Sequence, residues 1–196
     1  MKKNKIYIGG GFTVDQLLWI VPIASNYLKK KNKTIIFENK LPKKFLNNKI
    51  IFNHLKNIEN IEQNNLYFFK SRLIKYFLII LKHLPKIILY VFFINRKSIL
   101  KNKKDWFTFQ FKHSFWDTSL NMCKDGDLEP SIKNKFLSIV KCCAALELAK
   151  KIHKNGIHTV FLGHTVYTSR TLFAFLREKK IKIFTQAAFN LHYQPK

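Results

Sequence analysis

The sequence predicts an α/β fold, in which a mainly parallel sheet is flanked by helices. Short apolar segments of strand length alternate along the chain with longer segments that have helical periodicity. Helices between consecutive strands act as crossover connections, and such connections join parallel strands. The positions of the glycines also fit a parallel sheet with a ligand site. Three of the six stand together at Gly9 to Gly11, directly after the first predicted strand. In a parallel sheet, ligands gather at the carboxyl ends of the strands.

The elements follow from this alternation and from local helix signals. Strands are predicted, in chain order, at Lys5 to Ile8, Thr34 to Phe37, Ile50 to Phe52, Trp106 to Phe111, His158 to Leu162 and Ile181 to Thr185. Helices are predicted at Val14 to Lys31, Ser131 to Asn155 and Ser169 to Lys179. The first helix begins with the capping-box pair Thr13 and Gln16. The second has Pro130 ahead of it and Gly156 just past its end, as helix boundaries often do. We expect residues 1–196 to form a single domain.

The apolar middle of the chain, at about residues 66–104, is expected to be a helical insertion. Its longest uninterrupted apolar run is far shorter than the ~20 residues that a spanning helix needs, and Pro85 is expected to divide it into two helices. Four lysines at helical spacings form a basic stripe beside an aromatic face: Lys75, Lys82, Lys86 and Lys97. Two interpretations stay open. The stripe suits the surface of an anionic membrane, or it is the solvated edge of a buried helical hairpin.

The net charge of +25 comes almost entirely from lysine, since arginine occurs only at Arg72, Arg96, Arg170 and Arg177. A protein that reads bases more often uses the arginine fork and a defined motif, so no specific nucleic-acid partner is predicted. The three cysteines have neither metal-ligand nor disulfide spacing, which predicts no metal site and a reducing compartment. Glycines and Asp15 interrupt the N-terminal apolar segment, so we do not expect a secretion signal.

The glycine turn at Gly9, Gly10 and Gly11 is the first candidate ligand site. Three glycines let a ligand approach the backbone closely, whereas a plain turn from strand to helix needs only one residue with positive φ. Asp15 falls in the first helical turn, where the helix dipole favours a carboxylate whether or not it has a further role. The dinucleotide pattern G-x-G-x-x-G fails at Val14, so the sequence gives little support for a dinucleotide cofactor.

The second candidate site is the turn at His164, Tyr167 and Arg170, which follows the predicted strand ending at Leu162. These residues are spaced three apart, so those that lie within the first turns of the next helix share one face. An imidazole can take a proton near neutral pH, and a guanidinium at a helix N-terminus can hold phosphate. The alternative is a capping histidine with ordinary surface or packing residues.

These segments carry a resemblance to a known family. FWDTSLN at Phe115 to Asn121, GHTVYTSR at Gly163 to Arg170 and the closing FTQAAFNLH, together with the N-terminal glycine turn, resemble bacterial capsule- and lipopolysaccharide-type glycosyltransferases. Those enzymes have the GT-B architecture, in which two Rossmann-like domains face a cleft. The resemblance implies a Rossmann-like, N-terminal domain that holds the acceptor.

By this resemblance, the substrates are a nucleotide sugar and a saccharide acceptor, and no cofactor or metal is needed. Gly9 to Gly11 border the acceptor, His164 or Asp15 is the base, and Asp117, Tyr167 and Arg170 contact substrate. The enzyme acts at the cytoplasmic face of the cell membrane, as a peripheral protein.

The chain departs from the family pattern where it stops. It reaches Pro195 and Lys196 soon after the last predicted strand, without a second alternating half. We therefore expect either a separate C-terminal donor-binding half or a chain that is not catalytic alone. Two other interpretations stay open: a non-catalytic, basic, membrane-associated scaffold protein, and a nucleotide-dependent oxidoreductase or epimerase that uses the glycine turn.

Overall fold

The computed structural model describes most of the chain from residue 72 onward and three short strands before it. The described residues are 4–8, 33–37, 61–62, 72–101, 105–123, 129–163, 166–187 and 190–194. The chain forms two compact units. The first comprises Met1–Leu66, Ile152–His164 and Lys180–Lys196, and the second comprises Tyr67–Lys151 and Thr165–Lys179.

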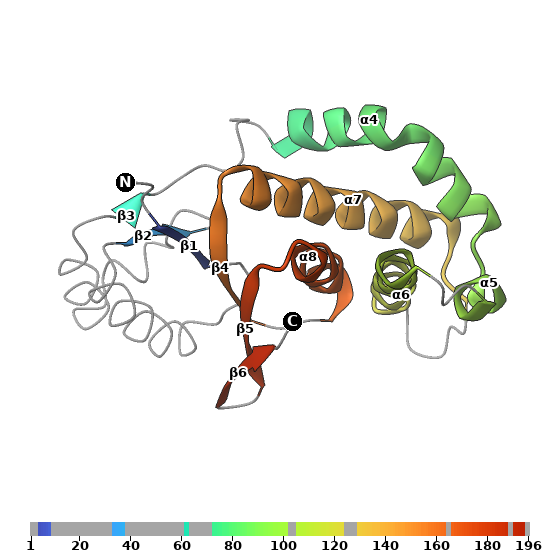
Figure 1. The fold of residues 1–196 in the computed structure, drawn as a ribbon. Coiled ribbons are helices and arrows are strands. Elements are labelled where there is room, and N and C mark those ends of the chain that lie inside the picture. The colour runs from blue at the N-terminus through green and yellow to red at the C-terminus, as the bar shows by residue number, and fades with distance from the viewer. Residues whose placement is uncertain are drawn as a thin grey trace. The chain divides into compact units, whose positions relative to one another are not determined.

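The first unit contains a sheet of six strands. They are β1 (Asn4–Ile8), β2 (Lys33–Phe37), β3 (Ile61–Glu62), β4 (Ile157–Leu162), β5 (Lys182–Ala187) and β6 (Asn190–Gln194). Their order across the sheet is β3-β2-β1-β4-β5-β6 (Figure 1). All neighbours pair in parallel except β5 and β6, which are antiparallel. The predicted α/β class with a mainly parallel sheet is therefore confirmed, whereas the flanking of this sheet by helices stays a prediction.

The two central strands are almost entirely buried. Ile6, Tyr7 and Ile8 of β1 are at most 1% exposed, and in β4 every residue but His158 is buried. Burial of consecutive residues, rather than of every second one, is typical of a parallel strand covered on both faces. Phe161 of β4 stacks on Phe184 of β5, with ring centroids 5.0 Å apart. These contacts form the core of the sheet.

Four of the predicted strands are confirmed to within two residues at each end, and two elements of the sheet were not predicted. β3 pairs with β2, and the closing strand β6 turns back along β5. The helix predicted at Val14 to Lys31 and the strand predicted at Ile50 to Phe52 lie outside the described residues.

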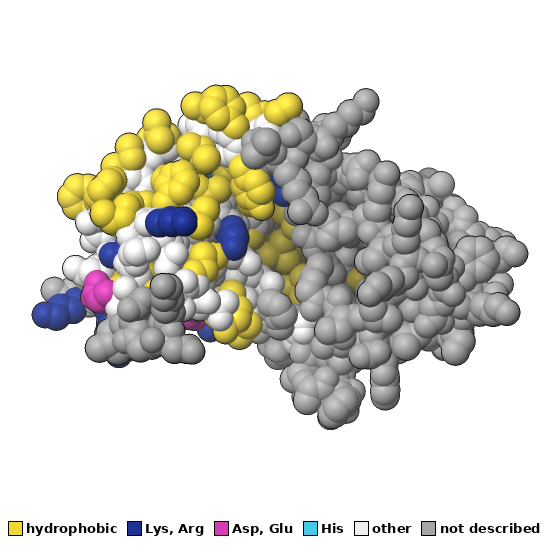
Figure 2. Space-filling model, turned by 180° about the vertical axis from the view of Figure 1, so that it is seen from behind, with side chains coloured by type: hydrophobic (Ala, Val, Ile, Leu, Met, Phe, Trp, Pro, Cys, Tyr) yellow, Lys and Arg dark blue, Asp and Glu magenta, His cyan; other side chains and the backbone are white. Residues whose placement is uncertain are grey.

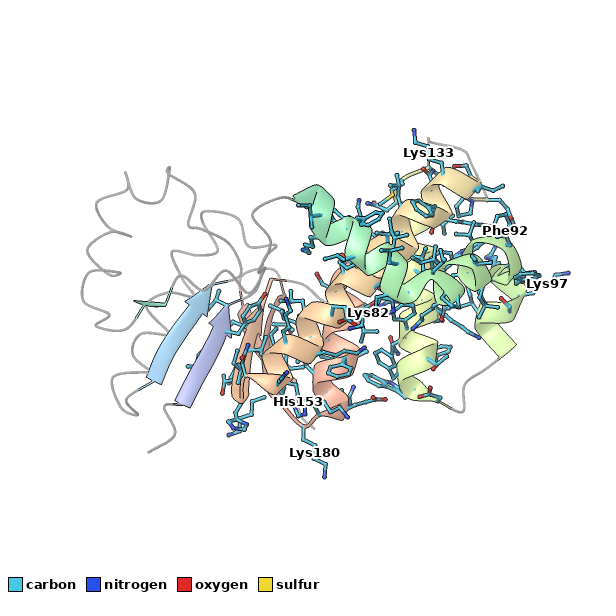
Figure 3. The ribbon with its side chains drawn as sticks, turned by 90° about the horizontal axis from the view of Figure 1, so that it is seen from above. Lys82, Phe92, Lys97, Lys133, His153 and Lys180 are labelled. Carbon is cyan, nitrogen blue, oxygen red and sulfur yellow. The ribbon has the colours of Figure 1, made fainter. Side chains whose placement is uncertain are left out.

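The second unit is helical. Its helices are α4 (Arg72–Phe93), α5 (Arg96–Lys101), α6 (Trp106–Leu120), most of α7 (Ile132–Lys154) and α8 (Tyr167–Glu178). α4 crosses over α7 (Figure 3), and α6 lies beside α8 (Figure 1). The rings of Phe111 and Phe115 on α6 meet the edge of Tyr90 on α4, with centroids 5.4 and 5.2 Å apart. Edge-to-face contacts of this kind fix the spacing of the helices as well as burying apolar area.

The strand predicted at Trp106 to Phe111 is wrong, because these residues form the first turns of α6. Asp105 is the N-cap, and its carboxylate accepts a hydrogen bond from the backbone N–H of Phe107 at 3.2 Å. Phe107, Phe111 and Phe115 are four residues apart, so they lie on one face of a helix. The last two are fully buried. A helical period explains why the side chains of Phe111 and Phe115 are both buried. The strand prediction had relied on the short apolar segment alone.

The helical middle is confirmed for α4 and α5, and its interruption near Pro85 is visible as a kink. His83 has non-helical dihedral angles (φ −112°, ψ 16°), two residues ahead of the proline. Proline has no N–H to donate, and its ring clashes with the preceding turn of a helix. The helices at 132–154 and 167–178 also confirm their predictions.

Candidate functional site

The strongest candidate site in the first unit is the edge of the sheet where β1 and β4 end. The two strands are parallel neighbours, and Ile8 lies opposite Phe161. The segment that begins with Gly9 therefore leaves the sheet at the same edge as Gly163, which follows β4. A sheet in which the two strands ran in opposite directions would have separated these segments.

This edge is also the place where the chain order of the sheet reverses. Going outward from β1, the chain adds β2 and β3 on one side and β4 and β5 on the other. At such a switch point, the connections after adjacent strands lead to opposite sides of the sheet and leave a crevice between them. Gly9, Gly10, Gly11, Asp15 and His164 lie outside the described residues, so their shared site stays a prediction that rests on the strands before them.

In the helical unit, the structure brings together two of the predicted site residues. Nη1 of Arg170 on α8 donates to Oδ2 of Asp117 on α6 at 2.8 Å, and both side chains are partly exposed. The two residues are far apart in the sequence and were predicted separately. A guanidinium has five N–H donors, and this bond uses one of them. Arg170 can therefore bind an anionic group while Asp117 fixes its orientation.

His113 lies one turn before Asp117 on α6 and was missed in the sequence. Its Nε2 atom is buried and has no hydrogen-bond partner among the described residues, and its ring lies 4.4 Å from that of Phe109. Burial lowers the pKa of His113, with a smaller upward influence from Asp117 and a downward one from Arg170. The neutral imidazole is thus favoured at neutral pH. The signal that could have found it is the spacing of four between His113 and Asp117, which has meaning only once this segment is known to be helical.

Tyr167 begins α8 in an unusual conformation. Its φ is +51°, in the left-handed region that costs a residue with a bulky side chain about 1 kcal/mol or more. Its carbonyl accepts a hydrogen bond from Oγ of Ser114, which itself accepts one from Thr171 at 2.8 Å. These buried hydroxyls hold the start of α8 against α6. Tyr167 as a whole residue is 38% exposed, so a ligand can reach it.

The predicted common face is described for two of the three residues, Tyr167 and Arg170. Val166 is the N-cap of α8, so Tyr167 and Arg170 lie in its first turns, whereas His164 precedes the helix. The N-cap residue Val166 has no side-chain group that accepts a hydrogen bond from the first N–H groups of the helix. Its backbone N–H groups can hold an anion near Arg170.

Within the described residues, no group of three or more His, Cys, Asp or Glu side chains is placed to hold a metal ion. The cysteines Cys123, Cys142 and Cys143 are free thiols. Burial raises the pKa of Cys142 to about 11 and that of Cys143 to about 12, so neither is a ready nucleophile.

No protein-family model, curated protein or solved structure was found to match this chain.

Proposed function

We propose that this chain is the acceptor-side half of a GT-B glycosyltransferase. The reaction transfers a sugar from a nucleotide sugar to a hydroxyl of a growing surface polysaccharide or lipid-linked saccharide. One observation carries the proposal: the parallel neighbours β1 and β4 end at one edge of the sheet, at its switch point, and they are followed in the sequence by Gly9 and by Gly163 and His164.

The sheet order supports a Rossmann-like first unit. The order β3-β2-β1-β4-β5-β6 is that of the doubly wound nucleotide-binding sheet, apart from the antiparallel direction of β6. In the proposed GT-B enzyme, this chain supplies the acceptor-binding domain. A separate donor-binding domain forms the other side of the cleft between the two domains. Fold alone does not imply function, so the proposal depends on the residues at the switch point.

The chemistry assigns one task to each group. His164 takes the proton of the acceptor hydroxyl as it attacks the sugar, with Asp15 as the alternative base. Gly9 to Gly11 allow the saccharide to approach the backbone. In the helical unit, Arg170, oriented by Asp117, and the N–H groups at the start of α8 offer donors that suit a phosphate group of the substrate. Tyr167 lies at the start of the same helix and is the further candidate for contact with that group.

The test compares His164→Ala with His158→Ala in the complete enzyme. His158 is an exposed histidine of β4, so its loss controls for changes in charge and stability near the same strand. The release of nucleoside diphosphate from a panel of nucleotide sugars is measured with membrane lipid extracts as acceptors. We expect H164A to lower turnover by ~100-fold or more with little change in acceptor affinity, and H158A to change neither. Near-normal turnover in H164A would remove it from the mechanism.

A second variant tests the glycine turn. Gly10→Val should abolish acceptor binding and leave the circular dichroism spectrum unchanged.

The competing function is a non-catalytic, membrane-associated scaffold, which the exposed apolar side of α4 favours. It predicts no nucleoside diphosphate release with any donor, from the wild-type chain or from the variants.

A further inference from the structure

One side of α4 is an exposed apolar surface. Its members are Ile74, Phe77, Leu78, Leu81, Leu84, Ile88, Leu89, Phe92 and Phe93, which we call the α4 face. The two terminal phenylalanines are the most exposed, at 65% and 68%. Figure 2 shows how hydrophobic side chains gather over this part of the helical unit. Contiguous patches of this kind are rare on soluble monomers and mark surfaces that something else covers.

The opposite side of α4 belongs to the core of the helical unit. Ile79, Ile87, Tyr90 and Val91 are buried, and they pack with the aromatic residues of α6. At the kink, Lys82 and His83 both pair with Glu147 of α7, at 2.5 and 3.0 Å. The helix is thus held to its unit by one side and presents the other to its surroundings.

Because α4 is packed against its own unit on one side, it is better suited to lie on a membrane than to cross one. By length and composition, Ile74–Phe93 is apolar enough to span, with a mean hydropathy of 1.7. To span, however, the helix would have to leave its aromatic partners and carry Lys82 and Lys86 into hydrocarbon without Glu147. A helix that lies in the interface buries the exposed face and keeps these contacts.

The charge around the α4 face matches an anionic lipid surface. α4 and α5 contain no acidic residue, and both begin with arginine. Lys97 of α5 is exposed and lies near Phe92, at one end of the face (Figure 3). Since the whole chain carries a net charge of +25, it would be repelled by a cationic surface and would gain no electrostatic attraction from a neutral one.

Two of the four predicted stripe lysines, Lys82 and Lys86, have partners within the helical unit. The ammonium group of Lys86 lies 3.7 Å from the centroid of the Phe111 ring, and burial lowers its pKa. Lys82 is paired with Glu147. The apolar side chains are therefore the part of α4 that is available to lipid, with the basic residues at its margin.

We propose that the α4 face inserts into the headgroup boundary of an anionic membrane and anchors the protein there as a peripheral protein. The proposal does not depend on the proposed transfer reaction, because it rests on the helical unit alone.

The first experiment measures co-flotation of the full chain with vesicles. The vesicles contain either phosphatidylcholine alone or a mixture with phosphatidylglycerol. The variant Phe77→Ser/Phe92→Ser/Phe93→Ser removes three exposed rings of the face, and Val166→Ser removes an exposed apolar side chain outside it. We expect strong binding to the anionic vesicles, weakened by salt, a loss of roughly 100-fold in the triple variant and no change in V166S.

The second measurement tests insertion directly and does not depend on the triple variant. An environment-sensitive fluorophore is attached to Phe92→Cys, in a Cys123→Ser background, and for comparison to Val166→Cys. We expect a blue shift on anionic vesicles at position 92 and none at position 166. The proposal is overturned if the triple variant binds as the wild type does. It is also overturned if the face only mediates self-association, or if alkaline carbonate fails to extract the bound protein.

Discussion

The Glu147 carboxylate, which joins α4 to α7, allows a pH-dependent test of the packing in the helical unit. It accepts hydrogen bonds from Lys82 at 2.5 Å and Lys150 at 3.0 Å, and it lies 3.0 Å from Nε2 of His83. Burial raises the pKa of Glu147, but the hydrogen bonds and charges of the two lysines outweigh it and lower the pKa to about 2. The perturbation we consider is Glu147→Gln.

The magnitude follows from the change in pKa. A fall from 4.5 to about 2 corresponds to about 3 kcal/mol if nothing screens the interaction. The side chains of Lys82 and Lys150 are 58% and 44% exposed, so solvent screens much of this. We therefore expect E147Q to lower the free energy of unfolding by about 1–2 kcal/mol at pH 7.

The sign of the pH dependence is fixed, because the pKa of Glu147 is lower in the folded state. Its contribution is fully present above pH 4.5 and is lost as the pH falls towards about 2. Burial also lowers the pKa of His83 despite the bond to Glu147, so its protonation below pH 6.5 destabilises the fold in the same direction.

The assay is urea denaturation of the wild type, E147Q and Glu178→Gln at several pH values between 7 and about 3. Glu178 is an exposed acid on α8 and serves as the matched control. The difference between the wild type and E147Q should shrink below about pH 4.5, and E178Q should follow the wild type throughout. A difference that stays constant with pH, or no difference at pH 7, would refute the assignment of the stability to this ion-pair cluster.

Three further predictions concern local features. Tyr167→Gly should be more stable than Tyr167→Ala by about 1 kcal/mol in chemical denaturation, because glycine adopts positive φ without strain; equal stabilities would contradict the strained backbone. Iodoacetamide at pH 8 should modify Cys123 at least ~100-fold faster than Cys142 or Cys143 in the folded protein, as read by mass spectrometry, since the latter two are buried thiols with raised pKa values. Asp105→Ala should lower the melting temperature and Asp105→Asn should not, because asparagine also caps a helix; equal loss in both would mean that the charge matters rather than the cap.

The sequence allowed most of the sheet to be predicted, because buried parallel strands are continuous apolar runs. β1, β2, β4 and β5 were found in this way. The strand β3 is only two residues long, too short to carry a pattern of its own. Its pairing with β2 depends on tertiary context.

The error at Trp106 to Phe111 has a physical cause. Over six residues, alternating apolar and polar side chains satisfy a strand period, and the helical period becomes visible only when Phe115 is included. The same error concealed His113, whose relation to Asp117 exists only on a helix. The ion pair between Asp117 and Arg170 joins two helices that are far apart in the sequence, and no local pattern specifies such a pair.

The sheet order has a consequence for the way the chain folds. β1 is made first but acquires its neighbour β4 only after the segment Tyr67–Lys151 has been synthesised. Contacts between such distant segments carry a large loop-closure cost and form slowly, whereas contacts among α4, α6 and α7 arise within one continuous stretch. During synthesis, the helical stretch can therefore collapse before β4 has been made. At that stage, the backbone donors and acceptors on the β4 side of β1 are unpaired. We expect refolding to show a fast rise in helical signal followed by slower docking of the central strands, and a delay at this stage to favour aggregation through the unpaired strand.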